Sequence, residues 1–330
     1  MRAAVVGVGR VGSMLADDPL LAGDIFTHAE AYTKSELTDL VALCDTDRWR
    51  LDTAGTRWNI DALFTDAATM MATAMPEIVS VCTPTPSHLE VVRALVAAKK
   101  PPRVILCEKP LTRTLADAEE MARIAARRGV TIATIYMRRF AQNIIALKAY
   151  IDSGALGEIQ AVAGWYIGGT FHNGTHWFDM LRMLVGEAAW VEAFDTLREK
   201  GDDPTLDVVI GMRDGILATL RAGDAKRHAL FEMDIVMTGG RAQITDSGHV
   251  ILLSRTAPSP RYTGYVELEP VAADLGHRRD LMLHAVEDAV AAVTLSRPPA
   301  CTVDDGLAAM RIADAASRSS GTRIFLQDER

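Results

Sequence analysis

The stretch that decides the fold is AAVVGVGRVG, residues 3–12. Four small or β-branched apolar residues, typical of a buried strand, run directly into a G-x-G-x-x-G pattern. Its glycines, Gly7, Gly9 and Gly12, would allow a tight turn and a close approach of backbone N–H groups to a pyrophosphate at a helix N-terminus. The stretch therefore predicts a strand, a glycine loop and a helix that open a dinucleotide-binding domain.

The alternation of strands and helices continues outward from this loop through residue 135. Short apolar runs (LVALC, EIVSVC, RVILC and VTIATIY) are separated by stretches with helical spacing, such as HLEVVRALVAAKK and LADAEEMARIAARRG. Repeated βαβ units predict an α/β fold, a Rossmann domain with a doubly wound parallel sheet over residues 1–135.

The regular alternation of strand and helix patterns ends near Tyr136. Residues 136–330 are predicted to form a second α/β domain with a largely antiparallel open sheet. The segment VIGMRDGILATL places Asp-Gly between two apolar runs, which is a strong hairpin signal. This domain is expected to bind substrate and to mediate oligomerisation. Its two late helices are candidates for packing back on the Rossmann domain.

The composition excludes several classes of protein. Of 330 residues, 49% are hydrophobic and 24% charged, and the net charge of −8 with no long basic run argues against a nucleic-acid partner. No apolar run approaches the ~20 residues that span a bilayer, and the first residues lack a signal-peptide pattern, so we expect a cytoplasmic protein. The cysteines form no CxxC pair and are expected to be small buried hydrophobes in a reducing compartment: Cys44, Cys82, Cys107 and Cys301.

Asp45, which ends the second predicted strand, decides the choice of cofactor. A carboxylate there accepts hydrogen bonds from the ribose hydroxyls and repels a 2′-phosphate, so NAD is favoured over NADP. Asp45 lies 38 residues after Gly7, against about 20 in the usual fingerprint. Residues 17–36 are therefore predicted to be an insertion between the first helix and the second strand.

Two further motifs end strands at the predicted cofactor edge. In VCTPTPSH, residues 81–88, Thr83 and Pro84 would form the turn under the nicotinamide ribose, and Ser87 or Thr85 would cap the next helix. His88 is either a cofactor contact or a structural residue. In LCEKPLT, residues 106–112, Lys109 would enter the cleft and donate to a substrate oxygen, and a cis bond is expected before Pro110.

The motifs GVGRVG, CTPTPSH and CEKP, followed by a GG…H-x-x-x-H-x-x-D segment, resemble the Gfo/Idh/MocA family of oxidoreductases. The resemblance covers essentially the whole chain. It implies a Rossmann domain joined to an α/β domain with an open sheet, and oxidation or reduction of hydroxyls on sugars, inositols and related compounds with NAD(P). It also implies that Lys109 and His176 work at the reacting carbon.

The segment FHNGTHWFD, residues 171–179, departs from the family pattern. The family aspartate four residues before the histidine is replaced by His172, with Asn173 beside it. His172, His176 and Asp179 would share a helix face and could hold zinc, or could handle protons beside a substrate. The segment lacks the glutamate of H-E-x-x-H, and no other Cys/His cluster supplies ligands, so no metal is expected.

The predicted site can be stated by role. The predicted catalytic residues are Lys109, His176 and His172, and the predicted substrate contacts are Lys109, His172, Asn173, His176 and Tyr166. The predicted cofactor contacts are Gly7, Val8, Gly9, Arg10, Val11, Gly12, Asp45, Thr46, Arg50, Thr83, Pro84, His88, Glu108, Lys109 and Arg138. Arg138 or Arg139 is alternatively an ion-pair partner of a carboxylate where the domains meet.

Three functions are compatible with these residues. The first is an NAD-dependent dehydrogenase acting on a sugar, nucleotide sugar or cyclitol. The second is a lyase or glycosidase that retains NAD and uses transient oxidation, and the third is a non-catalytic NAD-bound sensor. A sheet with one uncovered face also predicts a homodimer or homotetramer formed through the C-terminal sheet.

Overall fold

The computed structural model describes residues 1–326, which fall into two compact units. Unit 1 comprises Met1–Phe140 and Arg279–Leu307, and unit 2 comprises Ala141–Arg278 and the segment from Ala308 onward. The unit boundary after Phe140 lies beyond the predicted one at residue 135, because the short 3-10 helix η4 (Met137–Phe140) groups with unit 1.

Unit 1 contains a six-stranded parallel sheet in the order β3-β2-β1-β4-β5-β6. The strand order reverses between β1 and β4, and in such sheets ligands bind outside the carboxyl ends of the strands at that point. The strands are β1 (Arg2–Val6), β2 (Asp39–Cys44), β3 (Leu63–Phe64), β4 (Ile78–Val81), β5 (Val104–Glu108) and β6 (Thr131–Ile135).

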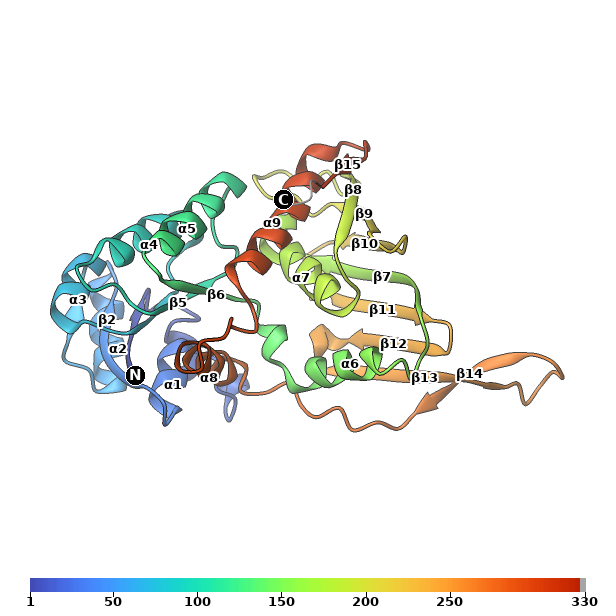
Figure 1. Cartoon of the computed structure of the whole chain (residues 1–330), viewed down its shortest axis with the longest axis horizontal. Helices are drawn as coiled ribbons and strands as arrows, with labels where there is room; N and C mark the ends of the chain where they lie inside the picture. The colour runs from blue at the N-terminus through green and yellow to red at the C-terminus, as the bar shows by residue number, and fades with distance from the viewer. Residues whose placement is uncertain (327–330) are drawn as a thin grey trace. The chain divides into compact units, whose positions relative to one another are not determined.

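Helices cover both faces of this sheet, as the alternating pattern predicts. One group contains α3 (Ala67–Ala74), α4 (His88–Ala97) and α5 (Leu115–Arg127), in which α4 contacts both others. On the other face, α1 (His28–Lys34) packs against the late helix α8 (Leu281–Thr294), as Figure 1 shows. Helix α2 (Arg48–Trp58) follows β2.

The glycine loop does not open a continuous α-helix, which corrects the prediction. A single turn at residues 9–15 leads into two 3-10 helices, η1 (Met14–Asp17) and η2 (Pro19–Leu21). The N–H groups of His28 and Ala29 then donate to the carbonyls of Val11 and Gly12, both at 3.0 Å. These bonds resemble the i to i−4 bonds of a helix, so α1 resumes the interrupted turn. The inserted segment is therefore residues 13–27, inside the first helix, rather than residues 17–36 after it.

Polar contacts hold the inserted segment against the rest of unit 1. The N–H of Ile25 donates to Asp280 Oδ1 at 3.0 Å, immediately before α8. The indole of Trp58 donates to Ser13 Oγ at 2.8 Å, and Arg57 forms an ion pair with Asp17. The inserted segment thus leaves the first helical turn after Gly12 and brings the chain back to it at His28, so α1 continues from that turn.

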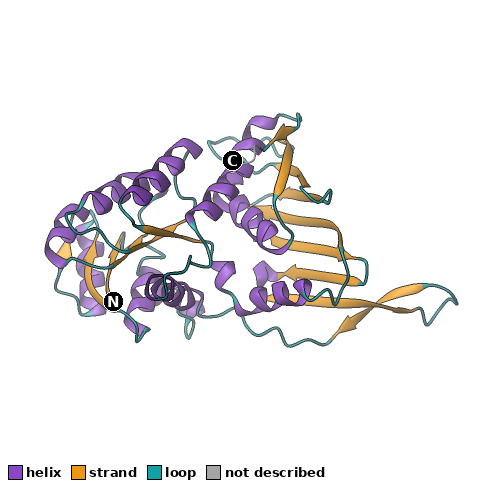
Figure 2. Ribbon diagram, viewed as in Figure 1, coloured by secondary structure: helices purple, strands orange, loops and turns teal. Residues whose placement is uncertain are grey.

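Unit 2 is built on a nine-stranded sheet in the order β14-β13-β12-β11-β7-β10-β9-β8-β15. All neighbours are antiparallel except β10 and β7, so the predicted largely antiparallel sheet is confirmed (Figure 2). The strands are β7 (Ile159–Ile167), β8 (Ala188–Phe194), β9 (Asp207–Met212), β10 (Leu217–Gly223), β11 (Phe231–Met237), β12 (Gly240–Thr245), β13 (Val250–Pro258), β14 (Val266–Val271) and β15 (Ile324–Phe325).

The two faces of the unit 2 sheet differ. Helix α7 (Thr175–Leu184) packs directly on one face, where the Trp177 indole donates to the Glu232 carbonyl at 2.9 Å. A Cβ on Gly164 would lie 2.4 Å from Trp177 Nε1, so glycine there permits the close approach. The other helices of this unit are α6 (Gln142–Asp152) and the C-terminal part of α9 (Val303–Ser319).

No helix within residues 1–326 is long and apolar enough to cross a membrane.

Candidate active site

The glycine loop at the end of β1 uses its three glycines for different purposes. Gly7 has φ +93°, and a Cβ there would lie 2.6 Å from the Thr83 nitrogen. A Cβ on Gly12 would lie 2.0 Å from the Gly7 carbonyl oxygen. By contrast, a Cβ on Gly9 would meet only the end of the Arg50 side chain, at 4.0 Å. The fold therefore requires Gly7 and Gly12, whereas Gly9 leaves open space above the loop where a pyrophosphate could approach.

Asp45 directly follows β2 and lies beside this loop. Its Oδ2 accepts the Val8 N–H at 2.9 Å and its Oδ1 accepts the Asp47 N–H at 2.9 Å, so the carboxylate orientation is fixed. Arg50, in the first turn of α2, pairs with Asp47 and reaches toward Gly9. Thr46 is exposed next to Asp45. These neighbours place the Asp45 carboxylate and the Arg50 guanidinium at the mouth of the loop, with Asp47 paired to Arg50.

The end of β4 supplies a buried hydroxyl that fits a cofactor. Thr83 Oγ1 is buried and has no hydrogen-bond partner among the described residues, so a bound ligand would satisfy it. Ser87 does not cap α4 as predicted, because its hydroxyl donates to the Pro84 carbonyl at 2.8 Å. Together with the open space at Gly9, the free Thr83 hydroxyl shows that the residues present fit a dinucleotide.

His88 is a buried connector of two loops at this edge. Its Nε2 lies 2.7 Å from the Thr83 carbonyl and its Nδ1 lies 3.1 Å from the Leu111 carbonyl. The side chain is only 1% exposed, which supports the structural alternative for this residue. Through these two contacts, His88 links the Thr83 turn to the segment that follows Lys109.

The predicted lysine lies where β5 ends. Lys109 is half-buried, and the Lys109–Pro110 bond is cis, as expected from the sequence. The preceding Glu108 accepts the Lys109 N–H through Oε2 at 3.3 Å and contacts His28 through Oε1 at 3.1 Å. The carboxylate thus joins the lysine turn to α1.

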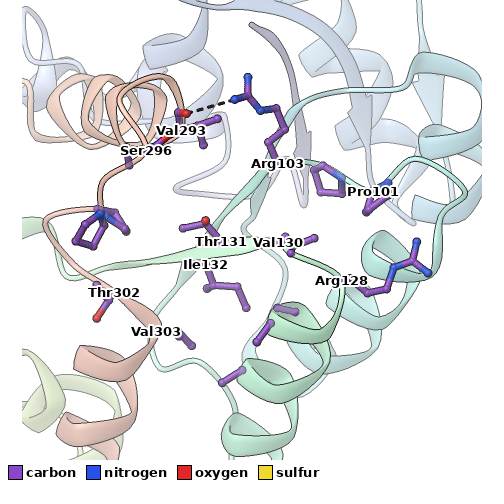
Figure 3. A pocket seen from close by; sticks show the side chains of 18 of the residues that line it. Pro101, Arg103, Arg128, Val130, Thr131, Ile132, Val293, Ser296, Thr302 and Val303 are labelled. Carbon is purple, nitrogen blue, oxygen red and sulfur yellow. Dashed lines mark hydrogen bonds between the residues drawn. The ribbon is translucent and has the colours of Figure 1, made fainter.

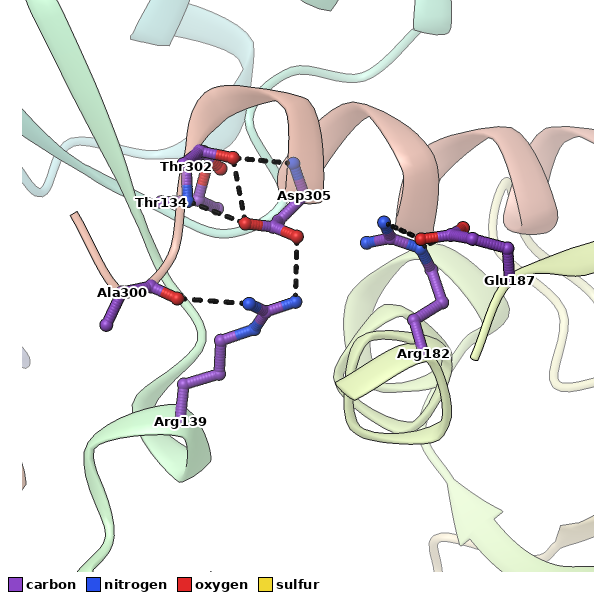
Figure 4. Close-up of polar contacts among 7 residues, drawn as sticks. All are labelled: Thr134, Arg139, Arg182, Glu187, Ala300, Thr302 and Asp305. Atoms are coloured by element: carbon purple, nitrogen blue, oxygen red, sulfur yellow. Dashed lines mark hydrogen bonds and ion pairs between the residues drawn. The ribbon is translucent and has the colours of Figure 1, made fainter. Parts of the chain in front are cut away.

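Arg139 of η4 serves the structure of unit 1. Figure 4 shows its guanidinium donating to Asp305 Oδ1 at 2.9 Å and to the Ala300 carbonyl at 3.0 Å. Asp305 also accepts the N–H and hydroxyl of Thr302 at the start of α9. Arg139 is therefore an ion-pair partner, but of a carboxylate within its own unit rather than of one where the domains meet, while the half-buried Arg138 remains a candidate cofactor contact.

In unit 2 the segment that carries the two histidines is a π-turn, η5 (Thr170–Gly174), followed by α7. Gly168 and Gly169, with φ of +78° and +91°, let the chain leave β7 and turn. The Asp203 carboxylate accepts the N–H groups of Phe171 and His172, both at 2.8 Å. Asp203 thereby satisfies the open N-terminus of the π-turn and fixes the backbone of His172.

The two histidines differ in exposure. His172 is exposed on the π-turn, whereas His176, in the first turn of α7, is only 8% exposed. The Asn173 amide donates to the Ile167 carbonyl at 2.8 Å, which holds this turn against the end of β7. No group of three or more His, Cys, Asp or Glu side chains within residues 1–326 is arranged to hold a metal ion.

Tyr166 is a core residue, which does not support its predicted contact with substrate. Its side chain is 0% exposed, and its hydroxyl donates to the Leu206 carbonyl at 2.8 Å beside Thr170 Oγ1. Burial raises the pKa of Tyr166. The signal was available in the sequence, because positions 162, 164 and 166 of a strand share one face.

One cavity of unit 1 lies away from the cofactor edge. About 690 Å³ in volume, it lies in unit 1 beside Arg103 and Thr131, at the amino ends of β5 and β6 (Figure 3). A cavity of about 550 Å³ in unit 2 is lined by Gly168, Gly169 and Asp203 beside the π-turn, with Lys200 and Lys226. The unit 2 cavity adjoins the π-turn that carries His172 and Asn173, because Asp203, which lines it, holds the His172 backbone.

Comparison with known proteins agrees with this geometry. Residues 1–136 match the GFO_IDH_MocA family model, described as an oxidoreductase family with an NAD-binding Rossmann fold. The chain is 26% identical to the myo-inositol 2-dehydrogenase of Thermotoga maritima, over 97% of this chain and 96% of that protein. It is 29% identical to the D-glucoside 3-dehydrogenase of Escherichia coli, over 48% of this chain and 41% of the relative.

Solved structures share the fold at lower identity. Levoglucosan dehydrogenase in complex with NADH superposes with a TM-score of 0.81 at 17% identity, covering all of both chains. The myo-inositol 2-dehydrogenase of Lactobacillus plantarum gives a TM-score of 0.77 at 23% identity, with 99% of each chain covered. The glycine loop and the Lys109 turn thus lie in a domain, residues 1–136, that matches the Gfo/Idh/MocA family of NAD-binding oxidoreductases, and the whole chain is similar to a myo-inositol 2-dehydrogenase.

Proposed function

We propose that the protein is an NAD-dependent dehydrogenase or reductase that acts on a CH–OH group of a sugar, nucleotide sugar or cyclitol. The observation that carries the proposal is the carboxyl edge of the parallel sheet. There the glycine loop with open space at Gly9 follows β1, the acid Asp45 follows β2 and the unpartnered Thr83 hydroxyl lies after β4, which is the strand next to β5; Lys109 directly follows β5. The similarity to inositol and glucoside dehydrogenases supports this substrate class.

Bound NAD would accept or supply the hydride. The N–H groups of the glycine loop would hold the pyrophosphate, and Asp45 would accept the ribose hydroxyls. Thr83 would donate to the cofactor from the end of β4. Because the Asp45 carboxylate repels a 2′-phosphate, NAD should bind more tightly than NADP.

The remaining chemistry is a proton transfer. In the oxidation, the substrate carbon loses hydride, and His176 takes the hydroxyl proton as the carbonyl forms. The Lys109 ammonium donates to the same oxygen and stabilises its alkoxide character. In this proposal the exposed His172 binds a substrate hydroxyl or phosphate rather than orienting His176.

Two further properties belong to this proposal. The exposed face of the unit 2 sheet pairs with a second copy, giving a homodimer or homotetramer. The protein works in the cytoplasm on a small-molecule substrate, without a nucleic-acid partner and without a metal.

The test is turnover by the purified protein with NAD and a panel of myo-inositol, D-glucosides, levoglucosan and D-apiose. We expect NADH absorbance to appear with at least one compound of the panel, and a lower KM for NAD than for NADP. Dialysis against a chelator should leave the rate unchanged. Tight NAD binding without NADH production from any compound would contradict the dehydrogenase assignment.

A further inference from the structure

A buried chain of polar side chains ends at the carboxylate next to Lys109. The Tyr32 hydroxyl lies 2.7 Å from Ser80 Oγ, which lies 2.7 Å from His28 Nδ1. His28 Nε2 lies 3.1 Å from Glu108 Oε1, and Glu108 Oε2 accepts the Lys109 N–H. The chain therefore runs from inside α1, across β4, to the turn that carries the proposed catalytic lysine.

Two strands and one helix bring these residues together. Ser80 pairs with Leu106 across β4 and β5, and Glu108 lies two residues further along β5, so Ser80 and Glu108 share a sheet face. On α1, which packs on the sheet, His28 and Tyr32 are four residues apart and occupy one helix face. The interrupted first helix delivers His28 to this position, because its N–H donates to the Val11 carbonyl.

The hydrogen count gives the chain a direction. Among residues 1–326, Ser80 Oγ is the hydrogen-bond partner of the Tyr32 hydroxyl, so Tyr32 donates its hydrogen there. Ser80 then donates its one hydrogen to His28 Nδ1, and the N–H at Nε2 points to Glu108. This neutral tautomer uses every hydrogen once. A hydrogen on Nδ1 instead would leave Ser80 facing two donors with no acceptor for its own hydrogen.

The same residue types form the Ser-His-Glu triads of hydrolases, but the location excludes that chemistry. Ser80 and His28 are both 0% exposed, so no substrate carbonyl can reach the hydroxyl. The far end, Tyr32, is also 0% exposed, so the chain does not lead protons to solvent. Its remaining effect is to fix the Glu108 carboxylate, whose side chain is 12% exposed.

We propose that His28 is a positioning residue for Lys109, acting through Glu108. The proposal rests on the proposed catalytic function of Lys109. The His28 backbone holds the glycine loop at Val11 and its imidazole holds Glu108, so one residue links the pyrophosphate loop to the lysine turn. Loss of the imidazole should disturb the lysine turn and spare the glycine loop, because the backbone bond stays.

The first experiment reads the tautomer directly. Long-range ¹⁵N NMR spectra of histidine-labelled protein, with His28→Gln to identify the signals, should show His28 neutral with hydrogen on Nε2 at neutral pH. Ser80→Ala removes the donor to Nδ1 and should change the tautomer ratio of His28. A protonated ring, hydrogen on Nδ1, or spectra indifferent to Ser80→Ala would overturn the proposal.

The second experiment separates positioning from stability. His28→Leu should lower kcat about 10²-fold, the cost of a misplaced reacting group, with NAD affinity close to wild type. His28→Gln, which keeps an acceptor and a donor, should restore most of kcat. The control His284→Leu removes an imidazole on α8 whose Nδ1 lies 3.2 Å from the Phe140 carbonyl oxygen, and should leave kcat close to wild type. Unchanged kcat in His28→Leu, or equal losses in the Gln and Leu variants, would count against the proposal.

The two experiments distinguish failure of the proposed dehydrogenase function from failure of the proposed role of His28. Absence of turnover by the wild-type protein would refute the proposed function. The tautomer result, which needs no turnover, would then decide alone whether His28 is held as proposed.

Discussion

At the residue scale, the glycine loop separates what the fold requires from what a ligand requires. Gly7 and Gly12 would place a Cβ against backbone atoms, whereas Gly9 would not. The sequence pattern treats the three glycines alike, because it carries no distances. The fold does not require glycine at position 9. The small residue there is therefore best explained by a ligand, such as a pyrophosphate, that approaches the loop at Gly9.

Gly9→Ala should therefore fold normally and weaken NAD binding about tenfold or more, or at least about 1.4 kcal/mol, because the methyl group enters the space of the pyrophosphate. The matched control is Gly7→Ala, which meets both a positive φ and a backbone clash. It should lose about 1–3 kcal/mol of stability. Fluorescence titration with NAD and thermal unfolding of both variants measure the two effects. Unchanged NAD affinity in Gly9→Ala would argue against a pyrophosphate at this loop.

The acid–base roles are tested by Lys109→Met and His176→Asn. Each should retain NAD affinity and lose about 10²–10⁴ in kcat, the usual cost of removing a positioned acid or base. NAD titration and steady-state kinetics with the best compound of the panel give both values. Wild-type rates in either variant would move the chemistry to other residues.

At the element scale, most strands of the two sheets follow from apolar runs and turn residues in the sequence. The Asp-Gly turn of Asp214 and Gly215 joins β9 and β10 as an antiparallel pair, as predicted. The short strand β3 was missed because two residues carry no periodicity. The interrupted first helix was misplaced because its closing hydrogen bonds join His28 to Val11, which no local pattern reports.

The candidate site was predictable only where a motif marks it. Lys109 and the glycines stand in motifs, and their strand-end positions follow from the strand pattern. Asp203 was missed because it acts on the π-turn from more than thirty positions away in the sequence. Ser80 and His28 were missed for the same reason, since only the folded sheet and helix bring them to Glu108.

The π-turn gives a prediction about His172. His172→Asp should raise KM and leave kcat within about tenfold, because an exposed residue that binds substrate contributes uniform binding. Asp203 holds the backbone of this position, so the turn should persist in the variant. Steady-state kinetics decide the matter. A collapse of kcat at unchanged KM would place His172 in the proton transfer instead.

At the scale of the whole molecule, the unit 2 sheet carries an exposed apolar row. Leu217 and Val236, 51% and 40% exposed, flank Ala161 on three neighbouring strands, and Trp165 is 40% exposed on the same face. Apolar side chains gathered on an open sheet are typical of a contact between copies. This row is the surface through which we propose that the homo-oligomer forms.

Charge on that row should dissociate the oligomer. The double variant Leu217→Glu, Val236→Glu should lower the mass measured by light scattering to the monomer value of 35.8 kDa. The control Leu20→Glu alters a side chain that is 92% exposed in unit 1 and should leave the mass unchanged. A wild-type protein that is already monomeric would contradict the proposed assembly.

Buried thiols set an alkaline limit on stability. Burial raises the pKa of Cys44 to about 12 and also raises the pKa of Cys82 and Cys107 above the 9.0 of a free thiol. Above pH 9 the unfolded chain loses these protons while the folded chain keeps them. The stabilisation is therefore complete below the unfolded pKa and is lost as pH rises toward the folded pKa.

The free energy of unfolding should accordingly fall between about pH 9 and pH 11, by up to about 1.4 kcal/mol per pH unit for each such thiol. Urea unfolding under reducing conditions measures it. Cys44→Ala removes one titrating group and should show a shallower decline than the wild type. Parallel curves for the two proteins would show that Cys44 does not titrate differently on folding.

The interrupted helix of unit 1 also has a consequence for protein engineering. Since Val11 and Gly12 bond directly to His28 and Ala29, the inserted segment leaves the helix and re-enters it at the same place. Such a site tolerates a graft, because a guest sequence whose ends lie close together can be spliced in without moving the host. The exposed tip at Leu20 is thus a suitable insertion site for a reporter peptide or an affinity tag.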